Sequence, residues 1–357
     1  MASGRCVAVT RNSQRASQPA SQPACRASAR AHELVARPDR ASVSDILAIT
    51  GPIYLCIAMG YLCTRRGVFS KPDLRVLGKF VLNLALPALL FNAVSQRPLR
   101  EVMQADYLAA YALGSMAMLL GGYAWARYVV RSAPSYQAYV AMGMSCSNSG
   151  YMGYPVAQLV LGSIAPVALA LNMLFENLIK LPVLLTLADN ADAGAHRPWG
   201  TVLRDIARGW VRTPMLVVIP LALLVSVMGW ALPGPLARTI TLFSQVTTGL
   251  ALFVIGGALV GLQLKGKRRL VGQITIGKLV LHPLCVFLAF TFVVPIADPQ
   301  LRTAALLFAA MPMLGIFPIM AQRHGHEDTA AAALLITTIA SFFTLSGLLW
   351  MLKHLSL

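Results

Sequence analysis

Long apolar runs, separated by short polar segments, dominate the chain. A helix that crosses the hydrocarbon core of a bilayer takes about 17–25 apolar residues. Seven runs approach or meet that length without a formal charge: Ile46–Leu62, Tyr107–Ala126, Ala138–Leu161, Pro214–Leu232, Thr239–Leu262, Thr303–Ala321 and Ala330–Leu352. Three more contain ionisable groups: Val76–Val94 (Lys79), Ile164–Ala188 (Glu176, Lys180) and Gln273–Ile296 (Lys278, His282). The pattern predicts an all-α integral membrane protein with ten transmembrane helices.

Composition agrees with a membrane protein. Of 357 residues, 57% are hydrophobic and 12% are charged, whereas a soluble domain has about 25% charged residues. The six cysteines form no C-x-x-C pair and lie mostly within the apolar runs. They are therefore interpreted as small apolar side chains, not as a disulfide framework or a metal site. No cofactor and no metal are expected.

The net charge of +17 would suit a nucleic-acid-binding protein, but its distribution indicates a membrane topology instead. With loops assigned alternately to two sides, one side has fifteen basic residues: Arg65, Arg66, Lys71, Arg75, Arg127, Arg131, Arg197, Arg204, Arg208, Arg212, Lys265, Lys267, Arg268, Arg269 and Arg323. The other side has five: Arg97, Arg100, Arg238, Arg302 and Lys353. Basic loops stay cytoplasmic, so we expect a multi-pass protein of the cell (inner) membrane. Both termini then lie outside, and the loop between the fifth and sixth spans is cytoplasmic.

Residues 1–44 differ from the rest of the chain. They contain seven arginines and two acidic residues and no apolar segment of the kind found in a secretory signal. An Arg- and Ser-rich composition is also that of a transit peptide. We expect either a disordered tail or a translation start placed too far upstream. We favour the second, because seven arginines would resist export ahead of the first span.

The chain repeats itself at an offset of 162 or 163 residues. The offset aligns these pairs: Pro52 with Pro214, Asn83 with Gln245, Pro87 with Gly249, Phe91 with Phe253, Pro155 with Pro318, and Gly162 with Gly325. Five spans in each half is an odd number, so the halves enter the membrane in opposite directions. We divide the chain into the tail 1–44, a first five-helix repeat 45–188, a cytoplasmic linker 189–209 and a second repeat 210–357. Inverted repeats with broken helices at corresponding positions indicate a secondary transporter whose binding site lies at the midplane.

Two spans contain residues that interrupt a helix. The fourth span has the segment SNSGYMGYP at positions 147–155, and the ninth has Pro312, Gly315 and Pro318. A proline inside a helix costs about 3 kcal/mol. Non-helical backbone at membrane depth persists only where protein buries it or where it lines an aqueous cavity. A simple kink at each proline is the alternative, but the polar residues beside the first break favour two broken helices, 4 and 9, that cross near the protein centre.

At these two motifs the chain resembles the auxin efflux carrier family, whose bacterial members are similar to the plant PIN-formed transporters. The first motif is Asn148, Gly153 and Pro155, and the second is Pro312, Gly315, Ile316 and Pro318. Further similarities are the segment Leu86–Phe91, the pair Gly60-Tyr61 and the segment Phe175–Asn177. The resemblance covers residues 45–352. Ser147 stands where the family pattern has a proline, and the long central cytoplasmic loop of the plant carriers is missing.

The resemblance implies a fold and an activity. It implies a scaffold of helices 1, 2, 6 and 7, often forming a homodimer, and a transport domain of the other six helices that moves like an elevator. It also implies export of a small organic anion, since plant relatives carry an indole acetic acid and some bacterial relatives are associated with malonate or malate. A more distant similarity to the sodium–bile acid symporters keeps a Na⁺- or H⁺-coupled symporter as an alternative.

The helix breaks provide a candidate substrate site. A helix N-terminus presents free N–H groups and a partial positive charge, which bind anions without a cationic side chain. We expect Asn148 and Ser147 to donate hydrogen bonds to a carboxylate, and Gly153 and Gly315 to allow close approach of the backbone. The substrate-binding candidates are Ser147, Asn148, Ser149, Gly150, Gly153, Pro155, Pro312, Gly315, Pro318, Asn83, Gln245 and Thr248. The scaffold members Asn83, Gln245 and Thr248, together with Thr247, equally fit hydrogen bonds that merely join helices.

Ionisable residues at membrane depth are functional candidates. Glu176 and Lys180 lie four residues apart and can pair, and with Asn177 they are our candidates for ion coupling. Alternatively, Lys180 snorkels to the cytoplasmic side and Glu176 is protonated. Lys79, Lys278 and His282 lie nearer the ends of their spans and are expected to be interfacial anchors.

Other classes of function fit less well. The chain has no H-E-x-x-H, no G-x-S-x-G and no paired aspartates within the spans, so an intramembrane enzyme lacks its catalytic groups. A channel would need rings of like charge or carbonyl filters. A membrane sensor that binds the anion without moving it shares every feature above, and the sequence leaves it open, as it does the substrate, the driving ion and the oligomeric state.

Overall fold

The computed structural model describes residues 43–184, 186–187, 200, 204, 213–262, 268–315, 317–322 and 327–355. All but two residues of the predicted tail 1–44, and most of the predicted linker 189–209, lie outside the described residues. Within the described part the chain is helical and forms no β-strand.

The helices of the first half follow the predicted apolar runs. Several contain a π-helical turn, denoted η; η4 is a 3₁₀ turn. Their bounds are α2 Val43–Arg65, α3 Lys71–Phe80, η1 Val81–Ala85, α4 Leu86–Ser95, α5 Leu99–Val102, α6 Ala105–Trp125, η2 Ala126–Val130, α7 Pro134–Ser145, η3 Ser149–Gly153, α8 Tyr154–Leu161, η4 Gly162–Ile164, α9 Ala165–Phe175 and η5 Glu176–Lys180.

The second half has a similar series of helices. Their bounds are α12 Pro214–Met228, α13 Gly234–Gln245, α14 Thr247–Ala258, α15 Arg268–Ile276, η6 Gly277–Leu281, α16 His282–Leu288, η7 Ala289–Val293, α17 Pro299–Ala310, α18 Phe317–Gln322 and α19 Glu327–Leu355.

Six helical segments among the described residues are long and apolar enough to cross a membrane. They are Lys71–Ser95, Leu99–Val130, Ser149–Leu184, Gly234–Ala258, Arg268–Val293 and Asp328–Leu352. A shorter apolar helix, Pro214–Met228, accompanies them. The prediction of an all-helical, multi-pass membrane protein is confirmed at this level. The full arrangement of ten spans in two inverted repeats stays a prediction.

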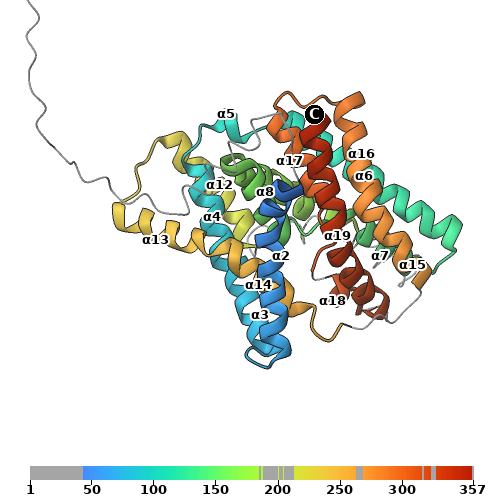
Figure 1. Ribbon diagram of the computed structural model, residues 1–357. Coiled ribbons are helices and arrows are strands. Elements are labelled where there is room, and N and C mark those ends of the chain that lie inside the picture. Colours follow the sequence, from blue (N-terminus) through green and yellow to red (C-terminus); the bar gives the residue numbers. More distant parts are fainter. Residues whose placement is uncertain are drawn as a thin grey trace, which may run out of the picture.

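The helices pack in two groups (Figure 1). In the first group α2 packs on α14, and α4 packs on α12 and α13. In the second group α6 packs on α7 and α16, while α19 packs on α15 and α18. The short helix α8 contacts α2 and α14 of the first group and α17 of the second, and α9 contacts α4 and α6. The segment α8–α9 therefore lies between the two groups, where a site formed by both would be.

Glycines bring α2 and α14 into backbone contact. A Cβ atom on Gly60 would collide with the carbonyl oxygen of Phe253, and one on Gly256 would collide with the carbonyl oxygen of Ile57. Small residues allow this approach, and membrane helices use it because van der Waals packing drives their association. The first packing group is thus joined by an interface with no room for a larger side chain.

Candidate binding site at the two helix breaks

Both predicted helix breaks are present. After α7 ends at Ser145, Cys146 is extended (φ −84°, ψ 121°), and a new helical run begins at Ser149. After α17 ends at Ala310, Met311 is extended (φ −63°, ψ 152°), and α18 begins at Phe317. The described residues in between, 146–148 and 311–315, are non-helical, so the alternative of continuous but kinked helices is wrong.

The two breaks satisfy each other's backbone groups. The N–H of Asn148 donates to the carbonyl oxygen of Pro312 at 2.9 Å, and the N–H of Leu314 donates to that of Cys146 at 3.3 Å. Ser147 and Met313 face each other as an antiparallel bridge. Unpaired backbone groups in hydrocarbon are costly, and this pairing explains how two interruptions persist inside the protein.

The side-chain amide of Asn148 lies at this crossing without a hydrogen bond to any described residue. The residue is 3% exposed, and its Oδ1 atom is buried without a partner. A Cβ atom on Gly315 would lie 3.8 Å from Asn148 Nδ2, and Gly315 itself is exposed. A buried amide without a partner is destabilising unless something binds it, so the amide is available to a ligand that approaches past Gly315.

The other motif residues are positioned by packing. Pro155 is buried in the first turn of α8, Pro318 is the second residue of α18, and the carbonyl of Pro312 is engaged by Asn148. A Cβ atom on Gly153 would lie 2.7 Å from the ring of Phe308 in α17. The structure therefore gives Gly153 a reason in helix packing, and the expected approach of its backbone to a substrate stays a prediction.

Gly150 and Ser149 lie in the π-helical turn that follows the first break. A Cβ atom on Gly150 would lie 3.3 Å from a methyl group of Leu86 in α4. Ser149 Oγ donates to Glu176 Oε2 at 3.0 Å. The turn is thus fixed from two sides, by the first packing group and by the helix that contains Glu176.

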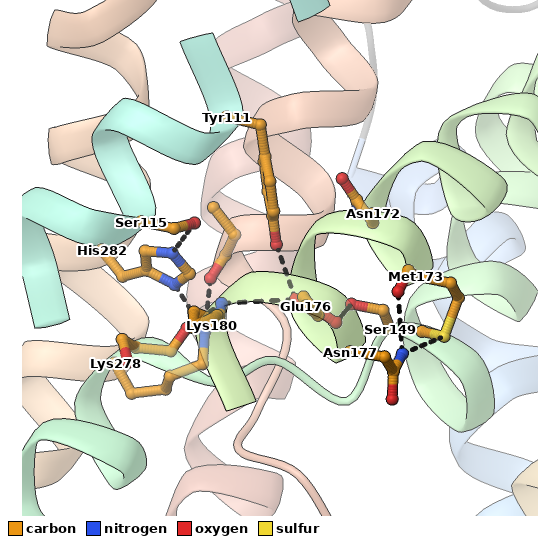
Figure 2. A network of polar contacts seen from close by, with 12 residues as sticks. Tyr111, Ser115, Ser149, Asn172, Met173, Glu176, Asn177, Lys180, Lys278 and His282 are labelled. Atoms are coloured by element: carbon orange, nitrogen blue, oxygen red, sulfur yellow. Dashed lines mark hydrogen bonds and ion pairs between the residues drawn. The ribbon is translucent and has the colours of Figure 1, made fainter. Parts of the chain in front are cut away.

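Glu176 and Lys180 form a buried pair that braces the first break (Figure 2). Lys180 Nζ lies 3.5 Å from Glu176 Oε1 and donates to the carbonyl oxygen of Ser145 at 2.9 Å. Tyr111 donates its hydroxyl to Glu176 Oε1 at 3.0 Å. Lys180 is 0% exposed, so the alternative in which it snorkels to the membrane surface is wrong. The pair holds Ser145 before the break and Ser149 after it.

Lys278 and His282 were expected to be interfacial anchors, and that expectation is wrong. Both are 0% exposed. Lys278 Nζ donates to the carbonyl oxygen of Ala309 at 2.6 Å and lies 3.0 Å from His282 Nδ1, while His282 Nε2 lies 2.9 Å from Ser115 Oγ. The position of these residues near the end of an apolar run does not make them exposed. The helix α17 ends inside the protein and brings the carbonyl of Ala309, near its end, to Lys278. The i, i+4 spacing, shared with Glu176 and Lys180, was the signal in the sequence.

A cavity of about 560 Å³ lies between helices of the first packing group and the segment α8–α9. Its lining is Leu89, Asn92, Ala93, Gln96, Arg97, Glu101, Tyr154, Gln158, Ser163, Pro166, Ser244, Gln245 and Thr248. It reaches Tyr154, which directly follows Gly153. The guanidinium of Arg97 donates to the carbonyl oxygen of Ser163 at 2.8 Å and lies 3.5 Å from the carboxylate of Glu101.

The cavity separates the remaining candidates. Gln245 and Thr248 line it, and their place on the scaffold side of a substrate site stays a prediction. Asn83 does not: it is exposed and donates to the carbonyl oxygen of Lys79 in its own helix at 2.9 Å. Asn177 donates to the carbonyl oxygen of Met173 at 2.9 Å and is not hydrogen-bonded to Glu176 or Lys180. Sequence analysis missed Arg97 and Gln158, whose place in the cavity depends on tertiary packing.

Apolar helices broken at a paired crossing, with polar groups buried at that crossing and a polar cavity nearby, are typical of a membrane carrier. The comparison with protein families agrees with this class. The family model described as "Membrane transport protein" matches residues 49–350. The chain therefore belongs to this family, the auxin efflux carriers that its motifs resemble.

Two of the following relatives are similar to the chain over nearly their whole length. A protein of Rhizobium meliloti (strain 1021) named "Putative malonate transporter" is 29% identical over 312 residues, which are 87% of this chain and 97% of the relative. The "Uncharacterized transporter YfdV" of Escherichia coli (strain K12) is 24% identical over 314 residues, 86% of this chain and 96% of the relative. An "Uncharacterized transporter" of Methanothermobacter thermautotrophicus is 29% identical over 115 residues, 31% of this chain and 37% of the relative.

Proposed function

We propose that the chain is a secondary transporter that exports a small organic anion, a mono- or dicarboxylate of the size of malonate or malate. The observation that carries the proposal is the pairing of the two helix breaks, where the donor atom Nδ2 of the Asn148 side chain lies 3.8 Å from the position that a Cβ atom on the exposed Gly315 would take. The relative named for malonate supports the substrate class.

The first break has the chemistry to hold a carboxylate. The helical run that starts at Ser149 continues through α8 to Leu161, and the first N–H groups of a helix have no acceptor within it. Such an end carries about half a positive charge. In our proposal the carboxylate binds these N–H groups and the side-chain Nδ2 of Asn148, while Gln245 and Thr248 line the neighbouring cavity that reaches Tyr154.

Movement of one packing group against the other would give alternating access. In this proposal the first group, with α2, α4, α12 and α14, is the scaffold and the site of a homodimer, and the helices that bear the breaks form the part that moves like an elevator. The ten spans then form two inverted repeats, with both termini outside and the loop between spans five and six in the cytoplasm. The cavity beside Tyr154 is the space through which the anion would reach its site from one side of the inner membrane.

Substrate binding is tested on purified protein with a panel of malonate, malate, acetate and indole acetate. A ligand at a hundred times its Kd adds about 2.7 kcal/mol to stability, which a thermal shift detects. Asn148→Ala should weaken binding of the active compound about 10–100-fold, since a hydrogen bond to a charged group contributes about 1.5–3 kcal/mol. Asn83→Ala, a matched loss of an amide outside the cavity, should leave the affinity unchanged. Equal affinities of Asn148→Ala and wild type would remove Asn148 from the site.

Flux in liposomes tests transport itself. A carrier moves the bound carboxylate across the membrane, whereas a sensor binds it and moves none. The same assay addresses our proposal that Glu176, Lys180 and Asn177 take part in ion coupling. If flux through Glu176→Gln keeps the wild-type dependence on pH and sodium, Glu176 has no role in coupling and serves only to brace the break.

A further inference from the structure

Lys278 and His282 form a second buried ionisable pair, which the transport proposal above does not use (Figure 2). They come from η6 and the first residue of α16, and Ser115 of α6 completes a chain of three groups. All three side chains are fully buried. Ionisable groups at membrane depth are retained where they bind or move charge.

Hydrogen bonding limits the charge that the pair can hold. An ammonium group only donates, so a charged Lys278 requires His282 Nδ1 to accept. The imidazole is then neutral, with its proton on Nε2 and directed to Ser115 Oγ. A charged imidazole donates from both nitrogens, so Lys278 must then be a neutral amine. The pair therefore exists with one positive charge or with none.

No carboxylate contacts this pair among the described residues. Glu176, the one buried carboxylate among the residues that the structure describes, is already engaged by Lys180, Tyr111 and Ser149. The titratable groups that interact with the pair are Cys146, Glu176 and Lys180, together with Tyr111, whose ring contacts that of His282. The buried residues of α17 are all apolar, and those of α19 that are described are apolar or carry a hydroxyl group. A proton on the pair is thus a positive charge without a counter-ion of its own.

The pair is connected directly to the second helix break. Lys278 Nζ donates to the carbonyl oxygen of Ala309, and Ala309 precedes by three residues Pro312, whose carbonyl accepts the N–H of Asn148. An anion at the paired breaks would stabilise a positive charge here, and that charge would in turn favour the anion. Such coupling is reciprocal by thermodynamic necessity.

We propose that Lys278 and His282 are a proton-binding site, which takes up one proton from solvent when a carboxylate binds at the paired breaks and returns it when the anion leaves. The proton resides on Lys278 Nζ or His282 Nδ1, and no bond other than to this proton forms or breaks. The inference rests on the proposed function and deepens it, because each anion would then move together with one proton.

Calorimetry on the purified full-length protein tests the proposal with malonate as the probe. Titrations in phosphate and in Tris, whose ionisation enthalpies differ, report the protons taken up for each malonate bound. Wild type should take up about one proton, and where the free pair is unprotonated the affinity for malonate should fall about tenfold for each unit of rising pH. Malonate binding with no proton uptake would overturn the inference and leave the proposed function standing.

Variants identify the site. Lys278→Met and His282→Gln should bring the proton uptake close to zero, whereas the matched exposed controls Lys79→Met and His354→Gln should keep it near one. If proton uptake persists in Lys278→Met and His282→Gln but is lost in Glu176→Gln, the proton binds to Glu176 and the proposal is refuted. Should the buried variants fail to fold, the wild-type stoichiometry still decides whether a proton accompanies the anion. If none of malonate, malate, acetate or indole acetate binds, the proposed function fails and this inference fails with it.

Discussion

Replacing Lys180 by methionine probes how the first helix break is held. Methionine keeps most of the length of the lysine stem but has no ammonium group. The change removes the contact of Nζ with Glu176 Oε1 at 3.5 Å and its hydrogen bond to the carbonyl oxygen of Ser145 at 2.9 Å. Glu176 is left as a buried carboxylate with only the hydroxyl groups of Tyr111 and Ser149 as donors.

The expected cost follows from the burial of the pair. Breaking a buried ion pair by removing one partner costs about 3–5 kcal/mol, mainly because a buried charge loses its compensation. Two hydroxyl donors remain on the carboxylate, so we expect the lower end, about 3 kcal/mol, for Lys180→Met. Glu176→Gln leaves the ammonium with the carbonyl of Ser145 and should cost a similar amount. The double variant Glu176→Gln/Lys180→Met contains no buried charge at this place and should cost about 2 kcal/mol less than the sum of the two.

Thermal unfolding of the four proteins in the same detergent measures this cycle. Detergent-solubilised proteins often unfold irreversibly, so the comparison uses one scan rate and reads differences only. The double variant should be more stable than the sum of the single effects predicts. Strictly additive shifts would mean that Glu176 is already neutral in wild type and that the two residues do not act as an ion pair.

Three further substitutions test the packing. Gly60→Ala should destabilise the protein by about 1–3 kcal/mol through overpacking at a backbone contact, while Gly51→Ala in the same helix meets nothing within 4 Å and should be neutral or stabilising in thermal unfolding. Gly153→Ala should lower the melting temperature because its methyl group would collide with the ring of Phe308. Adding Phe308→Leu to the same chain should recover part of this loss. If the melting temperature does not recover, the collision with Phe308 is not the cause of the destabilisation. Thr247→Val should raise the melting temperature, because the buried Thr247 Oγ1 has no partner among the described residues. Removing such a group should stabilise the protein by about 1 kcal/mol. A lower melting temperature would instead indicate that this hydroxyl forms a hydrogen bond in solution.

The breaks were predictable because their causes are local. Asn148, Gly153 and Pro155 interrupt a helix through their own backbone chemistry, as do Pro312 and Pro318, and no knowledge of their neighbours is needed. That the two broken helices cross near the protein centre followed from the repeat and from the cost of unpaired backbone groups in hydrocarbon, whereas their backbone pairing was found only in the structure. The class of protein followed from the same two facts.

Burial and partners were less predictable. Lys278 and His282 were predicted to lie near the end of a span. The length of an apolar run can be read from the sequence, but the turn of the helix that contacts the end of another helix, here α17, cannot. Asn83 and Gln245 align at the repeat offset, yet only Gln245 lines the cavity, since the repeat does not preserve which helix face is turned inward. The packing contact of Gly153 and the cavity position of Arg97 likewise depend on helices distant in sequence.

The bridge between Ser147 and Met313 also bears on how such a chain could have arisen. At each helix break, the backbone groups of Asn148 and Leu314 donate to carbonyl oxygens in the other half of the polypeptide. A single half in a bilayer would therefore leave these amide and carbonyl groups without hydrogen-bond partners. If the two halves are the inverted repeats that we propose, an ancestral half-length protein would have met this requirement by associating with a second copy inserted in the opposite direction. Fusion of the two genes would then have preserved, within one molecule, a contact that began between two.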